Sequence, residues 1–192
     1  MFAVHAALRG AEAIAVEARP SNNSLILENA RHSRVPIELH PLAVSDCHGY
    51  AVLDVASDNE NAAIRRTEAG SIGDYVVALA LLDELIGDRH IDVMKIDIEG
   101  HEYRAMLGAR KMLERCRPVI VTEYSPEFQQ AGSGVPGSVY LEYLEQFGYG
   151  ISIMLRSGEL KPAAGTAEID ELCRHLGYHV DLLLEPTVRQ IA

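Results

Sequence analysis

Short apolar runs alternate with amphipathic stretches along most of the chain, most clearly from Ile91 to Glu123. Residues 93–96 are apolar apart from Lys95, which is typical of a strand buried on both faces of a parallel sheet. Apolar residues at helical spacing predict a helix over 102–116, and residues 119–122 predict a second buried strand. This segment therefore predicts a strand–helix–strand unit.

The same alternation continues on both sides of that unit and predicts an α/β sheet with helices on both faces. The last two strands, separated by a turn and a short helix, predict an antiparallel C-terminal edge pair on a mostly parallel sheet. Ser21 is the predicted cap of its helix, and Pro41 interrupts its strand. The other predicted strands are 11–18, 36–44, 50–55, 75–80, 149–155 and 180–184, the other helices are 2–8, 21–31, 81–86, 139–147 and 169–176, and Ser57–Gly73 and Tyr124–Gly137 are predicted loops.

Composition narrows the class of protein. A chain of 192 residues favours a single domain over 1–192. The net charge of −11 argues against a nucleic acid or an anionic membrane surface as the main partner. Cys47, Cys116 and Cys173 are too far apart to predict a metal site, and with no long apolar segment we expect a cytoplasmic protein with reduced thiols.

Acidic residues end three of the predicted strands, at Glu17, Asp97 and Glu123, and Asp46 closely follows a fourth. Ligands of open α/β sheets bind outside the carboxyl ends of the strands, so these four side chains are expected on one rim. Glu17 would accept hydrogen bonds from a ribose, Asp46 would face an adenine, and Asp97 would face a ligand amine or a reacting group. The structural alternative is that such acids cap the next helix or form a turn.

Asp97 and Glu99 are the strongest candidates for chemistry, because both end a buried strand, where a charge is costly without a purpose. His101 follows, either as a general base oriented by Glu99 or as a first-turn helix residue that points to solvent. The ligand set is too loose to predict a metal.

The octapeptide KIDIEGHE, Lys95–Glu102, resembles the core signature of the FkbM-type methyltransferases. That family uses S-adenosylmethionine and has the Rossmann-like class I methyltransferase fold. The resemblance continues through RPVIVTEYSP and covers almost the whole chain. Its less specific parts are AVEARPSNNSLILENA, PLAVSDCHGYAVLDV, LALLDELI and YLEYLEQFGYGISIMLRSGEL.

Carried over by position, the resemblance implies roles for several of these residues. Glu17 matches the acid that binds the cofactor ribose, and Ser45 and Asp46 match the turn on the adenine side. Asp97 and Glu99 match the acidic pair near the centre of methyl transfer.

Two features depart from the family pattern. The family opens with a strand and a Gly-rich turn of the type D-x-G-A-N-x-G, which has no counterpart here, so we expect an N-terminally shortened form of the family's sheet. That strand would be central, and its loss would expose two strand edges in the core. The second departure is Asn61-Ala62-Ala63, where the family tends to have Asn-x-Gly.

The sequence thus predicts a methyltransferase that moves a methyl group from S-adenosylmethionine to a hydroxyl of a sugar or secondary metabolite. Asp97, Glu99 or His101 would take or orient the hydroxyl proton. The alternative is a truncated, non-catalytic relic or interaction module. The expected partners are a small-molecule acceptor and, because of the exposed edges, a second copy of the chain. A dehydrogenase is disfavoured, since no G-x-G-x-x-G is present.

Overall fold

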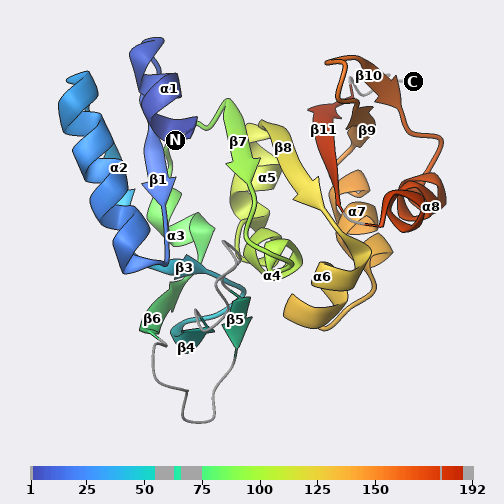
Figure 1. Ribbon diagram of the computed structural model, residues 1–192, viewed down its shortest axis with the longest axis horizontal. Helices are drawn as coiled ribbons and strands as arrows, with labels where there is room; N and C mark the ends of the chain where they lie inside the picture. Colours follow the sequence, from blue (N-terminus) through green and yellow to red (C-terminus); the bar gives the residue numbers. More distant parts are fainter. Residues whose placement is uncertain (1, 55–62, 66–74, 178, 188–192) are drawn as a thin grey trace. The chain divides into compact units, whose positions relative to one another are not determined.

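The computed structural model describes residues 2–54, 63–65, 75–177 and 179–187 (Figure 1). The chain forms a mixed α/β structure that divides into two compact units, Met1–Ala80 and Leu81–Ala192. We call them the N-terminal unit and the C-terminal unit. A single domain over 1–192 stays a prediction. Among the helices that the structure describes, none has both the length and the apolar character needed to cross a membrane.

The N-terminal unit holds two small sheets. In one, β1 and β2 pair in parallel; in the other, the strand order is β3-β6-β4-β5, and β4 is antiparallel to both of its neighbours. The predicted strand over 36–44 is divided at Pro41, which has no amide hydrogen, so that β2 and β3 join different sheets. Its elements are α1 (Phe2–Leu8), β1 (Ile14–Val16), α2 (Pro20–Ser33), β2 (Glu38–His40), β3 (Ala43–Val44), β4 (Gly49–Asp54), β5 (Ala63–Arg65) and β6 (Tyr75–Ala80).

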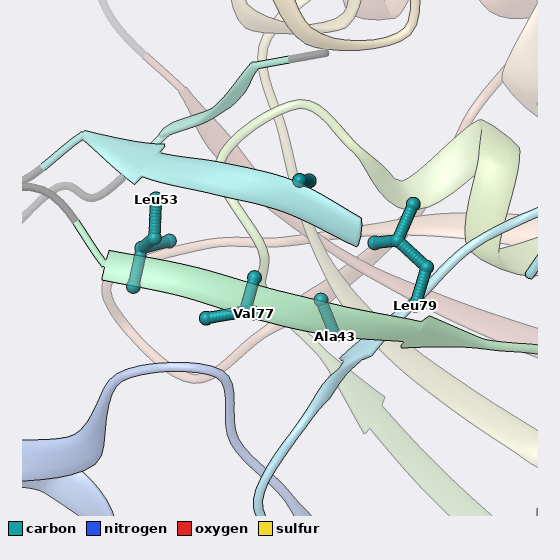
Figure 2. Packing of buried hydrophobic residues seen from close by; sticks show 5 residues of the cluster. Ala43, Leu53, Val77 and Leu79 are labelled. Atoms are coloured by element: carbon teal, nitrogen blue, oxygen red, sulfur yellow. The ribbon is translucent and has the colours of Figure 1, made fainter. Parts of the chain in front are cut away.

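An apolar cluster forms the core of the second sheet. Side chains alternate between the two faces of a strand, and Leu53 of β4 and Val77 and Leu79 of β6 are buried on the same face (Figure 2). Tyr50 and Val76 of the same strands are exposed. The predicted strands over 50–55 and 75–80 are therefore confirmed. On the face opposite the cluster, Val52 of β4 is also buried. Most of the predicted loop Ser57–Gly73 lies outside the described residues.

Helix α2 begins one residue earlier than predicted, with Pro20 in its first turn and Arg19 at the N-cap position. The predicted cap at Ser21 is wrong. Proline suits the first helical position because its missing amide hydrogen would have no partner there.

The C-terminal unit is organised around a five-stranded sheet of order β10-β9-β11-β8-β7. Strands β7 and β8 are parallel, with Met94 opposite Ile120. Strand β11 is antiparallel to both β8 and β9. Its elements are α3 (Leu82–Ile86), β7 (Val93–Ile96), α4 (Glu102–Leu107), α5 (Arg110–Cys116), β8 (Val119–Tyr124), α6 (Pro126–Gly132), α7 (Gly137–Glu145), β9 (Tyr149–Met154), β10 (Leu160–Pro162), α8 (Thr166–Leu176) and β11 (Val180–Pro186).

The antiparallel pairing of β9 with β11 and the parallel pairing of β7 with β8 are as predicted, and the mostly parallel sheet over the whole chain stays a prediction. Three of the four strand pairings in the C-terminal unit are antiparallel, and β11 lies between β8 and β9 rather than at an edge. The apolar pattern of a strand reports its burial and carries no direction. A helix before a strand is compatible with either orientation.

Strand β8 has one well-covered face. Ile120, Thr122 and Tyr124 are buried, and the residues between them are half-buried. Helix α7 covers the buried face through Tyr140, whose hydroxyl lies 3.2 Å from Oγ1 of Thr122, and α8 does so through Asp170, which accepts a 2.6 Å hydrogen bond from the Tyr124 hydroxyl. In β7, Ile96 is buried and Val93 is exposed, so the expected burial of β7 and β8 on both faces is not observed.

The predicted helix over 102–116 is two helices that break at Gly108. The carboxylate of Asp83 accepts hydrogen bonds from the amides of Lys111 (3.0 Å) and Met112 (2.8 Å) at the start of α5. The Asp83 amide donates in turn to the carbonyl of Gly108. Asp83 thus satisfies the free amides of a new helix start, which makes the break stable.

The predicted loop Tyr124–Gly137 is wrong, because it contains α6. Ser125 is the N-cap and accepts a hydrogen bond from the amide of Phe128, and Pro126 occupies the first turn. The Ser-Pro pair is a helix-start signal that outweighs the high content of Gly, Ser and Gln.

We expect Asp83→Ala to lower the free energy of unfolding by about 1–2 kcal/mol, because two amides of α5 lose their acceptor. Urea unfolding measures the change. Asp88→Ala removes an exposed carboxylate in the segment between α3 and β7. It is the matched control, and its free energy of unfolding should stay within about 0.5 kcal/mol of wild type. Equal stability of the two variants would contradict the capping role.

Candidate active site

The candidate site begins where β7 ends, in the segment Asp97–Gly100, which we call the acidic loop. Asp97 is exposed, and its Oδ2 accepts a 2.7 Å hydrogen bond from Nζ of Lys95. Glu99 is half-buried, and its Oε2 is enclosed without a hydrogen-bond partner among the residues that the structure describes. The loop therefore offers one paired carboxylate and one buried acceptor oxygen.

The backbone of the acidic loop has two consecutive left-handed residues, Glu99 with φ of 56° and Gly100 with φ of 91°. Glycine adopts this conformation readily, whereas for glutamate it costs about 1–2 kcal/mol. Such a residue persists when its surroundings hold it in place, and backbone strain of this kind concentrates at functional sites.

Helix α6 holds the acidic loop by close backbone contact at Gly100. A Cβ atom on Gly100 would lie 1.9 Å from the carbonyl oxygen of Phe128, and one on Gly132 would lie 2.7 Å from the Gly100 oxygen. The hydroxyl of Ser133 donates a 2.6 Å hydrogen bond to the same oxygen. The loop and α6 thus meet with no space for a side chain between them.

A buried carboxylate makes the second connection. Glu102, in the first turn of α4, is 2% exposed, and its Oε1 accepts a 2.8 Å hydrogen bond from the amide of Ile98. Its Oε2 accepts a short hydrogen bond from Nε2 of Gln129 in α6. Burial raises the pKa of Glu102 to about 7, and the hydrogen bonds offset part of that effect.

His101 lies at the start of α4 and is 4% exposed, so the expectation that it points to solvent is wrong. Its carbonyl accepts the first hydrogen bond of the helix from the amide of Ala105. The role of His101 as a general base stays a prediction.

Further charged groups surround the end of β8. Glu123 is half-buried, its Oε1 lies 3.3 Å from Nδ1 of His179, and Asp181 of β11 is its partner in strand register. Burial, and then the charge of Asp97, raise the pKa of Glu123; burial and Asp97 likewise raise the pKa of Glu99. Burial is the larger cause in both groups, and a bound cation would offset the added effect of the Asp97 charge.

The predicted cofactor residues of the N-terminal unit have local partners. Oε1 of Glu17 accepts a 2.7 Å hydrogen bond from the amide of Arg19, and Oε2 accepts a 3.2 Å bond from the side chain of Asn22. Glu17 therefore stabilises the start of α2. Ser45 is fully buried, and its hydroxyl donates a 3.1 Å hydrogen bond to Oδ1 of Asp46. The ribose and adenine roles stay predictions.

The expected convergence of the strand-end acids also stays a prediction, since Glu17 and Asp46 belong to one unit and the acidic loop and Glu123 to the other. Within the C-terminal unit, Asp97 and Glu123 directly follow the register pair Ile96–Thr122 of the parallel strands β7 and β8, so both lie at the same end of this sheet. Among the described residues, no group of three or more His, Cys, Asp or Glu side chains has the arrangement of a metal site.

The methyltransferase FkbM domain family matches residues 1–180, and the chain therefore belongs to this family of methyltransferases. A solved relative, the methyltransferase FkbM from Methylobacillus flagellatus KT, is similar to it with a TM-score of 0.54 and 14% sequence identity. The similarity covers 90% of this chain and 36% of that one, and at this identity it supports a methyltransferase-like α/β fold. A search of curated proteins found no match.

Several residues that shape the site were not singled out from the sequence. Gln129, Gly132 and Ser133 were assigned to a loop, although the Ser-Pro pair at 125–126 signals a helix start. His179 precedes the last strand, and no local pattern connects it with Glu123, because their proximity comes from the pairing of β11 with β8.

We expect Gly132→Ala to destabilise the fold by about 1–3 kcal/mol, because the added methyl group overlaps the carbonyl of Gly100. Helix propensity alone predicts the opposite sign, since alanine is favoured over glycine by up to about 1 kcal/mol. Urea unfolding distinguishes the two, with Ala131→Ser at the exposed neighbouring position as the control. A Gly132→Ala variant as stable as wild type would refute the close contact.

We expect Glu102 to make stability fall as pH rises from 4.5 towards 7. Its pKa is higher in the folded than in the unfolded chain, so the folded state binds more protons in that range. The isosteric Glu102→Gln should flatten this fall by an amount on the order of 2 kcal/mol. Urea unfolding at pH 4.5 and pH 7.5 measures it. Identical pH dependence in both proteins would show that Glu102 titrates normally.

Proposed function

We propose that the chain acts as an S-adenosylmethionine-dependent methyltransferase on a hydroxyl of a sugar or secondary metabolite. The observation that carries the proposal is the acidic loop at the carboxyl end of β7, in a chain that belongs to the FkbM methyltransferase family. Ligands of open α/β sheets bind at such strand ends.

The chemistry of the C-terminal unit fits the charged end of this cofactor. S-adenosylmethionine has a positive sulfonium and a positive amino group. The charge of Asp97 adds to the burial that raises the pKa of Glu99 and Glu123, and a bound cation would offset that charge. The enclosed Oε2 of Glu99 provides an acceptor. In this proposal Asp97 binds the positive end, while Glu17, Ser45 and Asp46 bind the ribose and the adenine side.

The bound cofactor would supply an activated methyl group, and the chain would position the acceptor and remove its proton. We propose that Glu99, rather than Asp97 or His101, accepts the proton of the acceptor hydroxyl. Burial raises the pKa of Glu99, which makes its carboxylate a better proton acceptor than an ordinary glutamate, and Asp97 is paired with Lys95. The burial of His101 confines it to contacts inside the fold.

Isothermal titration with S-adenosylhomocysteine tests the cofactor claim. We expect the folded chain to bind it and Asp97→Asn to weaken binding by about tenfold, the equivalent of about 1.4 kcal/mol. Asp88→Asn, another exposed acid, is the matched control and should bind like wild type.

A folded wild-type chain that does not bind S-adenosylhomocysteine would remove the cofactor claim and favour the non-catalytic alternative. Equal weakening by Asp97→Asn and Asp88→Asn would mean that the effect comes from total charge and does not involve the acidic loop.

A further inference from the structure

Glu102 and Gln129 form a buried polar pair between α4 and α6, with exposed fractions of 2% and 1%. Burial of a carboxylate is unfavourable by several kcal/mol unless hydrogen bonds compensate it, and an apolar pair of similar volume would avoid this cost. Neither side chain is open to solvent, so neither can touch a ligand directly. Any role of Glu102 and Gln129 in ligand binding must therefore be indirect and act through the groups to which they are hydrogen-bonded.

The hydrogen bonds of Glu102 lead to the acidic loop. One oxygen accepts from the amide of Ile98, which lies between the two acids Asp97 and Glu99. The other accepts from Gln129, whose backbone amide is anchored in α6 by a 3.0 Å hydrogen bond to the carbonyl of Ser125. A single carboxylate thus connects the backbone between the two acids to a helix.

This connection acts at the strained part of the chain. The left-handed backbone of Glu99 is unfavourable on its own, and release of the Ile98 amide would let the loop relax to a right-handed conformation. Such a change at one residue redirects its side chain. The contacts of Gly100 with α6 fix the far end of the loop, and Glu102 fixes its middle.

We propose that Glu102 and Gln129 are positioning residues that hold the acidic loop in the conformation in which Asp97 binds the positive end of the cofactor and Glu99 accepts the proton of the acceptor hydroxyl. This inference rests on the proposed function. It adds that the site requires a specific loop conformation and that α6 maintains it through Gln129.

The experiment compares Gln129→Ala with Gln130→Ala, the exposed neighbour on the same helix. Hydrogen exchange of the Ile98 amide, followed by NMR on the full chain without any ligand, measures how firmly the hydrogen bond to Glu102 holds the loop. Titration with S-adenosylhomocysteine reports binding. We expect Gln129→Ala to increase exchange at Ile98 and to weaken binding, each by about tenfold, while Gln130→Ala changes neither.

The double variant Glu102→Gln, Gln129→Glu, in which the two side chains trade places, tests whether the contact itself is required. It again places one carboxylate and one amide between α4 and α6, so exchange and binding should return to within about threefold of wild type. Exchange of the Ile120 amide in the core strand β8 is the control for overall stability and should stay unchanged. A role in stability alone would not give recovery at Ile98 while exchange at Ile120 stays the same. Should Gln129→Ala not fold, Gln129→Leu keeps the volume and removes the donor.

Unchanged exchange at Ile98 in Gln129→Ala would overturn the hold on the loop. Faster exchange with unchanged affinity would overturn the positioning role. Failure of the wild type to bind S-adenosylhomocysteine would instead overturn the proposed function, and the exchange measurement would still decide whether the pair holds the loop.

Discussion

A buried carboxylate is the interaction on which the candidate site depends. Glu102 accepts hydrogen bonds from the backbone of the acidic loop and from Gln129 of α6, and it does so out of contact with water. Together with the close approach of Gly100 to α6, it maintains a left-handed backbone at Glu99. The site is therefore built from a strained loop that a neighbouring helix keeps in place, as is common where geometry matters for function.

Charge gives this geometry its chemical character. Burial and mutual repulsion raise the pKa of Glu99 and Glu123, and Lys95 and His179 compensate only part of the negative charge. A positive ligand would relieve that repulsion. Burial, more than repulsion, raises the pKa of Glu99, so its capacity to accept a proton does not depend on the charge of Asp97 alone.

The sequence predicted most strands and helices, because apolar periodicity reports which residues are buried. It also placed Asp97 and Glu99 at the end of β7. It missed α6, because Gly, Ser and Gln between 129 and 134 suggested a loop, although Ser125 and Pro126 signal a helix start. It left the exposure of His101 open, and the burial of that side chain depends on tertiary packing and not on its neighbours in sequence.

The sequence alone determined the family resemblance, the acidic tip of β7 and the order of strands and helices, since each depends on residues close together in the chain. Only the tertiary structure decided that β11 pairs with β8 and brings His179 to Glu123, and that α6 supplies Gln129 to Glu102. These contacts join residues far apart in sequence. Strand direction and helix packing create them, and neither leaves a local pattern that could be recognised beforehand.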